Sequence, residues 1–198
     1  MSTRIATINR CLARVGERAI QSEAVAGADR LIAAHGAVTD FIFSDFDWAC
    51  GRTVRELARL AEAPSEHWAY AFQLPSDRLG PPTAYFPTKD LRCRQKTFET
   101  RGDTVLVDDE ALWARYARVP DPLDIPGYLR EAIDVALMAE FAFIVREDRA
   151  LRDRFRREAY GPDGYGGLVG HARSKESQAR PPKRMPLDDN PLLSVRRG

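Results

Sequence analysis

The stretch IPGYLREAIDVALMAEFAFIV, residues 125–145, decides the fold class of this chain. Pro126 suits the start of a helix, because a proline there leaves no backbone N–H without a partner. Apolar residues then recur at spacings of three and four, which predicts a helix with a broad apolar face; they are Leu129, Ile133, Ala136, Leu137, Phe141 and Ile144. A face this broad requires other helices to cover it.

The N-terminal quarter predicts two of those helices. Residues 3–15 carry one apolar stripe, and Gly16 is placed to end the helix. A longer helix is expected over 22–46. Gly27 and Gly36 interrupt its pattern at some cost, which indicates close helix contacts or a bend.

The C-terminal third predicts further helices and a tail. Asp148 can cap a helix over 149–160 in which Leu151 and Phe155 are buried. The glycine-rich run 161–170 breaks the pattern, and a helix is expected to resume over 171–180. The tail PPKRMPLDDNPLLSVRRG has no periodicity and is expected to be extended or mobile until a partner holds it.

The middle of the chain predicts short β-strands. Trp68, Tyr70 and Phe72 alternate as in a strand, which the run LPSD ends. Further strands are expected over 84–86, 96–99, 104–107 and 112–116, the second and third forming a hairpin. The segment 47–64 is ambiguous, because VRELARLAEA has a helical composition whereas Trp48, Cys50 and Val54 fall at even spacing.

These elements predict an α+β protein that is mainly α. We expect a helical bundle with an inserted small antiparallel β subdomain and an extended C-terminal tail. The predicted parts are the N-terminal helices 1–47, the β-rich insert 48–120, the C-terminal helices 121–180 and the tail 181–198.

Composition narrows the class of protein. The chain has 198 residues, a net charge of +1 and no apolar stretch near the roughly 18 residues of a membrane helix. Its start lacks the apolar block of a secretory signal, so we expect synthesis and use in the cytoplasm, or packaging from there. The three cysteines, Cys11, Cys50 and Cys93, are expected to be buried or half-buried apolar residues.

Residues 146–184 are locally basic. They hold eleven Lys or Arg residues against six Asp or Glu residues. This pattern is typical of a solvated helix face followed by a soluble tail. The alternative is a surface that faces DNA or an acidic partner.

No motif predicts catalysis, a metal site or a cofactor. The chain has neither a phosphate-binding loop nor a nucleophile elbow, and its three histidines, His35, His67 and His171, lie in separate segments. We therefore expect a protein that is not an enzyme. The aromatic residues are interpreted as core or subunit-interface anchors; the β-insert anchors are Trp48, Trp68, Tyr70, Leu74, Pro75 and Asp77.

Several motifs in order resemble the head-to-tail adaptors of short-tailed phages, the tail tubular protein A family. They cover about 1–180: IATINRCLARVGERAIQS from residue 5, DFDWA from 45, VRELARLAEAP from 54, WAYAFQLPSDRL from 68, ARYARVPDP from 114 and ARSKESQARPP from 172. The glycine-rich run at 160–170 departs from the continuous helix that the family implies there.

The resemblance implies a structural virion protein in the tail or neck, made in the cytoplasm of a bacterial host. Such subunits form a dodecameric ring between the portal protein and the tail nozzle, and double-stranded DNA passes non-specifically through the ring at ejection. The resemblance also implies an extended segment at 50–61 and no membrane partner. The tail is then expected to contact the portal or a neighbour, through Leu192, Leu193, Val195, Arg196 and Arg197.

Two alternatives stay open. One is a head-tail connector of a long-tailed phage, which neighbouring genes would distinguish. The other is a small DNA-binding or regulatory helical module that uses the basic region 146–184.

Overall fold

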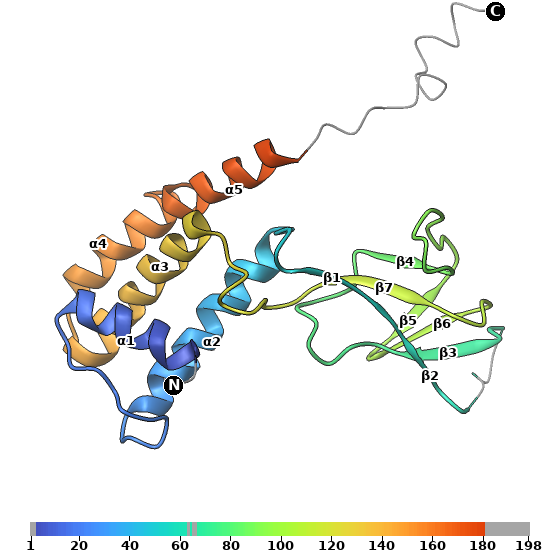
Figure 1. Ribbon diagram of the computed structural model, residues 1–198, viewed down its shortest axis with the longest axis horizontal. Helices are drawn as coiled ribbons and strands as arrows, with labels where there is room; N and C mark the ends of the chain where they lie inside the picture. The colour runs from blue at the N-terminus through green and yellow to red at the C-terminus, as the bar shows by residue number, and fades with distance from the viewer. Residues whose placement is uncertain (1–2, 63, 65–66, 181–198) are drawn as a thin grey trace, which may run out of the picture.

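The computed structural model describes residues 3–62, 64 and 67–180, and its helices gather on one side while its strands gather on the other (Figure 1). The architecture is α+β and mainly α, as the sequence predicted. The elements in chain order are α1 (Thr3–Val15), α2 (Ala28–Asp45), β1 (Arg52–Glu56), β2 (Ala58–Arg59), β3 (Tyr70–Gln73), β4 (Ala84–Phe86), β5 (Glu99–Arg101), β6 (Thr104–Val107), β7 (Trp113–Ala117), α3 (Gly127–Arg146), α4 (Arg149–Tyr160) and α5 (Gly167–Ala179).

Helix α3 is the centre of the helical part. It contacts α1, α2, α4 and α5, and it is buried over most of its circumference. Four consecutive residues, Val135 to Met138, are each at most 3% exposed, which only a helix covered on several sides can show. The apolar face predicted from residues 125–145 is therefore the core of the bundle.

Local signals set several helix ends as predicted. Gly16 adopts a φ of 87° after α1, where the Gly16 N–H donates to Ala13 O at 3.2 Å and the Glu17 N–H donates to Leu12 O at 2.9 Å. This pair of bonds is a Schellman motif. The Asp148 carboxylate accepts from the Leu151 N–H at 2.9 Å and caps α4, whose bounds match the prediction. Leu151 and Phe155 are half-buried and not fully buried.

Helix α2 is shorter than predicted. It begins at Ala28 and not at residue 22, because Gly27 has a left-handed φ of 85° that ends the preceding turns. The prediction of close helix contacts at Gly36 was wrong, since a Cβ there would meet nothing within 4 Å.

Helix α5 begins at Gly167, four residues before the predicted start. The Gly166 N–H donates to Tyr160 O at 2.7 Å, which closes a tight turn after α4. Gly167 has a φ of 60°, and a Cβ on it would lie 2.5 Å from Glu158 O. Only glycine fits this turn, so the run that broke the helical pattern joins two packed helices.

The strands form two antiparallel sheets, one in the order β1-β7-β4 and the other in the order β2-β3-β6-β5. Strands β1 and β2 confirm that most of the segment 50–61 is extended, despite its helical composition, whereas residues 50 and 51 belong to a turn. Strand β5 lies at Glu99–Arg101, later than the predicted 96–99, and pairs with β6 across the turn at Gly102.

The two parts have separate cores. Residues of the five helices form most of the first core, and the second core lies between the sheets; the members of the second are Leu57, Phe72, Leu74, Tyr85, Val105, Val107, Leu112, Ala114 and Tyr116. Strand β1 follows α2 in the chain, and strand β7 precedes α3. The two strands pair with each other from Arg52↔Ala117 to Glu56↔Trp113. The β-rich part is thus attached to the helices through two adjacent strands (Figure 1).

Candidate interaction surfaces

Five of the six predicted β-insert anchors belong to the β-rich part. Leu74 and Pro75 are buried, and Tyr70 packs half-buried against the β core. The Trp68 Nε1–H donates to Glu99 Oε2 at 3.0 Å, and the Tyr116 hydroxyl donates to Asp77 Oδ1 at 3.0 Å. These contacts hold the sheets and the loop after β3 in place.

Trp48 corrects the prediction. Its side chain is 1% exposed and lies in the helical core, where Nε1–H donates to Ile42 O at 2.7 Å. It tilts against Phe46 with the ring centroids 4.7 Å apart. Trp48 therefore closes the end of α2 and anchors no part of the β insert. The five predicted tail residues, Leu192, Leu193, Val195, Arg196 and Arg197, lie outside the described residues.

The cysteines are spread over three environments. Cys11 is buried and Cys50 half-buried, as predicted, but Cys93 is exposed, so the prediction for it was wrong. Burial raises the pKa of Cys11 to about 12 and that of Cys50 to about 11. Within the described ranges, no group of three His, Cys, Asp or Glu residues is arranged to hold a metal ion.

A buried carboxylate fastens α5 to the junction of the two parts. Glu176 is 5% exposed; its Oε1 accepts from the Ala49 N–H at 2.8 Å, and its Oε2 accepts from the Tyr128 hydroxyl at 2.8 Å. Burial and this hydrogen bond raise the pKa of Tyr128 to about 12. One side chain thus links α5 to the start of α3 and to the chain just before β1.

Ion pairs flank this carboxylate. Arg173 of α5 pairs with Asp45, and Arg180 pairs with Asp47 at 3.4 Å. Asp47 also accepts from Arg52 at 2.5 Å. The end of α5 is therefore held against the segment that leads from α2 into β1, and residue 180 lies at this junction.

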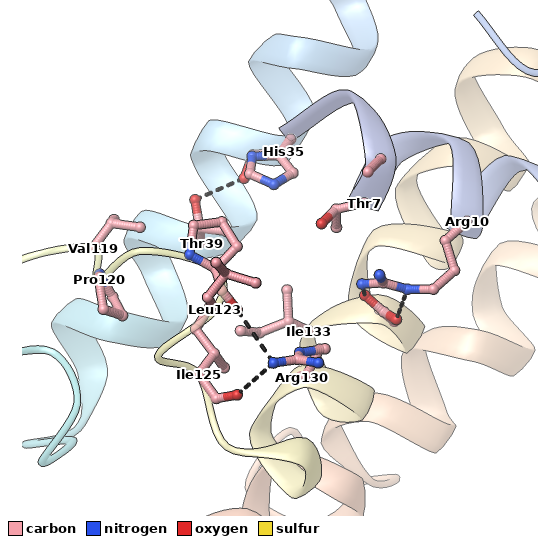
Figure 2. Close-up of a pocket in the computed structure, with 13 residues that line it drawn as sticks. Thr7, Arg10, His35, Thr39, Val119, Pro120, Leu123, Ile125, Arg130 and Ile133 are labelled. Carbon is pink, nitrogen blue, oxygen red and sulfur yellow. Dashed lines mark hydrogen bonds and ion pairs between the residues drawn. The ribbon is translucent and has the colours of Figure 1, made fainter. Parts of the chain in front are cut away.

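A small pocket lies where α1, α2 and α3 meet the segment 119–125 (Figure 2). Its volume is about 150 Å³. Arg10 and Asp134 form a two-pronged pair at one side, at 2.6 and 2.8 Å. His35 and Thr39 of α2 line it from another side, and burial lowers the pKa of His35. The Thr39 hydroxyl donates to His35 O at 2.8 Å and to Gly36 O at 2.9 Å.

At the rim of this pocket, the turn 121–124 exposes a leucine. Leu123 is 78% exposed, and its N–H donates to Asp121 Oδ1 at 2.9 Å. The Asp124 N–H donates to Asp121 O at 2.9 Å. Figure 2 shows Arg130 reaching from α3 to this segment, where it donates to Pro122 O and Ile125 O at 3.3 and 3.0 Å. The turn therefore presents an apolar side chain from a braced backbone.

An apolar groove of about 350 Å³ lies between α2 and α4. Phe41 of α2 is 54% exposed and meets Tyr160 of α4 edge-on, with centroids 6.0 Å apart. The remaining lining comes from apolar residues of α2, charged residues of α3 and α4, and a glycine of the turn after α4; they are Ala34, Ala37, Val38, Glu140, Arg156 and Gly164. Tyr165, at 84%, is the most exposed of the large apolar residues described.

Helix α4 presents arginines to solvent. Arg149, Arg154, Arg156 and Arg157 are exposed, and none of them makes an ion pair with a described residue. Asp153 and Glu158 lie among them on the same helix. The exposed side of α4 is therefore net positive.

No protein-family model matches this chain, and no curated protein matches it. Among the helices of the described ranges, none has the length and apolar character needed to cross a membrane.

Sequence reasoning missed two exposed apolar residues, Phe41 and Leu123. Phe41 lies next to the apolar stripe of α2 in sequence, so it is easily taken for a core residue. Leu123 stands in the run DPLD, whose two aspartates are the one local sign of a solvent-facing turn.

Proposed function

We propose that the chain is a structural virion protein, a head-to-tail adaptor whose copies form a ring that joins the portal to the tail and continues the DNA channel. The ordered resemblance to the tail tubular protein A family suggests this role. The observation that carries it is the division into two separately cored parts, joined at β1 and β7, with α5 fastened at the same junction. Such a subunit offers different surfaces to its two neighbours, as head-to-tail contacts in a ring require.

The proposed partners follow from this role. The ring, a dodecamer by resemblance, binds the portal protein on one side and tail proteins on the other. Double-stranded DNA passes through without sequence recognition, and the net charge of +1 suits sliding better than retention. The tail, with Leu192, Leu193, Val195, Arg196 and Arg197, starts at the α5 junction and contacts the portal or a neighbour. The protein is made in the bacterial cytoplasm and resides in the virion neck.

The test combines the purified chain with the portal protein of the same virus. We expect the chain alone to sediment as a monomer or weak oligomer, and electron microscopy to show a ring beneath the portal when both are present. A closed dimer in solution, or a portal without added density, would contradict the proposal.

A tail-deleted chain, residues 1–180, is the matched variant. We expect it to keep the thermal unfolding midpoint of the full chain, because both described cores are formed by residues of the retained part, and to bind the portal more weakly. Unchanged portal binding would refute the proposed role of the tail but not the proposed ring.

The exposed arginines of α4 favour one candidate from another class, a DNA-binding helical module. A gel shift with duplex DNA that weakens steeply between 50 and 200 mM salt, roughly the range in which phosphate contacts are screened, would support it. Replacing Arg149 and Arg157 by alanine should then weaken the shift for all sequences alike.

A further inference from the structure

We infer that Leu123 of one copy of this chain seats in the α2–α4 groove of the next copy, which makes these two surfaces the complementary halves of a head-to-tail contact. The inference rests on the proposed ring and names the residues that close it. It is carried by the shape, the position and the charge of the two surfaces.

The first half is a preformed knob, the turn 121–124. Leu123 is 78% exposed at its tip, and the Asp121 carboxylate and the Arg130 guanidinium fix the backbone around it. Ordering a loop on binding costs free energy, and this loop is already ordered. A rigid, exposed apolar residue between two carboxylates has the form of an interface anchor.

The second half is a socket of matching chemistry, the α2–α4 groove. Small residues, Ala34 and Ala37, leave room above α2, and the rings of Phe41 and Tyr160 form an apolar wall. The opening exists because α2 and α4 both pack on α3 and make little contact with each other. A leucine side chain fits such a groove and would cover part of Phe41.

The positions of the two halves favour a second copy in head-to-tail order. His35 and Thr39 of α2 line the pocket beside Leu123, whereas Ala37 and Phe41 line the groove. Ala34 and Val38 also line the groove, so at 100° per residue its centre lies about 130° around α2 from the side of His35 and Thr39, and the knob and the socket face different directions. One copy therefore cannot fill its own socket, and in the proposed ring each copy offers a knob to one neighbour and a socket to the other.

The charges at the two halves are complementary. Asp121 and Asp124 flank Leu123 and make no ion pair with a described residue. Arg156 lines the groove, and Arg157 lies beside it in the adjoining hollow. Glu140 and Asp153 also line these two spaces, but Glu140 is half-buried and Asp153 pairs with Arg152 at 3.9 Å. Among the described residues, the exposed and unpaired charges at this rim are therefore those of Arg156 and Arg157, which attract the carboxylates of the knob.

Disulfide trapping between two variants of the full chain tests the contact. Both carry Cys50→Ala and Cys93→Ser, and the buried Cys11 remains. One variant adds Leu123→Cys and the other Ala37→Cys. When the two variants are mixed and oxidised, we expect a mixed disulfide dimer on a non-reducing gel. The disulfide retains each dimer once it has formed, so the cross-linked product accumulates even when the contact is weak.

A matched control replaces Ala37→Cys by Ala150→Cys, since Ala150 is exposed on α4 about 15 Å along the helix from Tyr160. We expect this pair to trap at least about tenfold more slowly. Charge reversal gives an independent readout: Asp124→Arg in the knob or Arg156→Asp in the socket should each slow trapping about tenfold, and the two together should restore it.

The outcomes separate this inference from the proposed function. A ring beneath the portal without trapping of the Leu123–Ala37 pair, or equal trapping with Ala150, overturns the contact and leaves the adaptor role standing. Trapping without any ring beneath the portal supports the contact and contradicts the adaptor. Failure of both refutes both.

Discussion

Glu176 is the residue whose loss should reveal how the two parts are coupled. It is 5% exposed, and its carboxylate accepts hydrogen bonds from the Ala49 N–H and the Tyr128 hydroxyl, each at 2.8 Å. The substitution Glu176→Ala removes both bonds at the point where α5, α3 and the chain before β1 meet. We expect lower stability and a loosened junction.

The magnitude follows from the two bonds. A hydrogen bond to a charged group contributes about 1.5–3 kcal/mol, so the pair contributes about 3–6 kcal/mol. The substitution also removes the ion pair of Glu176 with Arg180, at 3.6 Å. Two effects reduce the net loss: the substitution removes a carboxylate that is costly to bury, and water can reach Ala49, which is an exposed residue. We therefore expect the free energy of unfolding to fall by about 2–3 kcal/mol.

Urea unfolding and amide hydrogen exchange measure this effect. The midpoint should fall without a change in slope, and protection of the Ala49 amide should fall more than that of the α1 amides. The Tyr128→Phe variant completes a double-mutant cycle, in which we expect a coupling of about 1 kcal/mol or more between the two side chains. Glu158→Ala, an exposed change on α4, is the control and should stay within about 0.5 kcal/mol.

A loss below about 0.5 kcal/mol for Glu176→Ala, or an unchanged Ala49 amide, would refute this reasoning. The first result would mean that relief of the buried charge cancels both bonds. The second would mean that α5 does not hold the junction.

Three further predictions concern titration, thiol chemistry and the glycine turn. Because the pKa of Tyr128 is raised from 10.0 to about 12 in the folded chain, its hydroxyl stabilises the fold below pH 10 and this contribution is lost as the pH rises toward 12; ultraviolet titration of the full chain against Tyr128→Phe checks it. A thiol reagent at pH 8 should label the exposed Cys93 within seconds to minutes, Cys50 far more slowly, and Cys11 only on unfolding. The reason is that burial suppresses the reactive thiolate of Cys50 and Cys11. Equal labelling rates would contradict the assigned environments. Gly167→Ala should destabilise the chain by more than about 1 kcal/mol, since its Cβ would lie 2.5 Å from Glu158 O, whereas Gly36→Ala should stabilise it by about 0.5–1 kcal/mol; thermal unfolding that ranks the two variants in the opposite order would refute the geometry at both glycines.

Much of the helical part was predictable because its signals are local. Gly16 and Asp148 end or begin a helix through bonds to residues at most five positions away. The apolar pattern from Leu129 to Ile144 likewise requires nothing beyond one helix to be recognised. Where a local signal was misjudged, as at Gly27, the predicted start of α2 was six residues too early.

The strands and the contact surfaces were harder because they depend on distant residues. VRELARLAEA has the composition of a helix, yet Arg52–Glu56 pairs with Trp113–Ala117, some 60 residues away, and this pairing decides its conformation. Trp48 sits next to the predicted β insert in sequence, but the packing of α2 draws it into the helical core. Neighbouring positions in a chain can therefore belong to different cores.

The sequence by itself determined an α+β chain built around the apolar helix at residues 125–145, with most helix ends in place and no motif for catalysis. Helix caps and apolar periodicity depend on residues a few positions apart, so they can be recognised from the sequence alone. Only the tertiary structure decided that Glu176 meets Ala49 and Tyr128, and that Leu123 and the α2–α4 groove remain uncovered on different sides of α2. Burial, pairing and exposure depend on which elements pack together, and that is a property of the assembled fold.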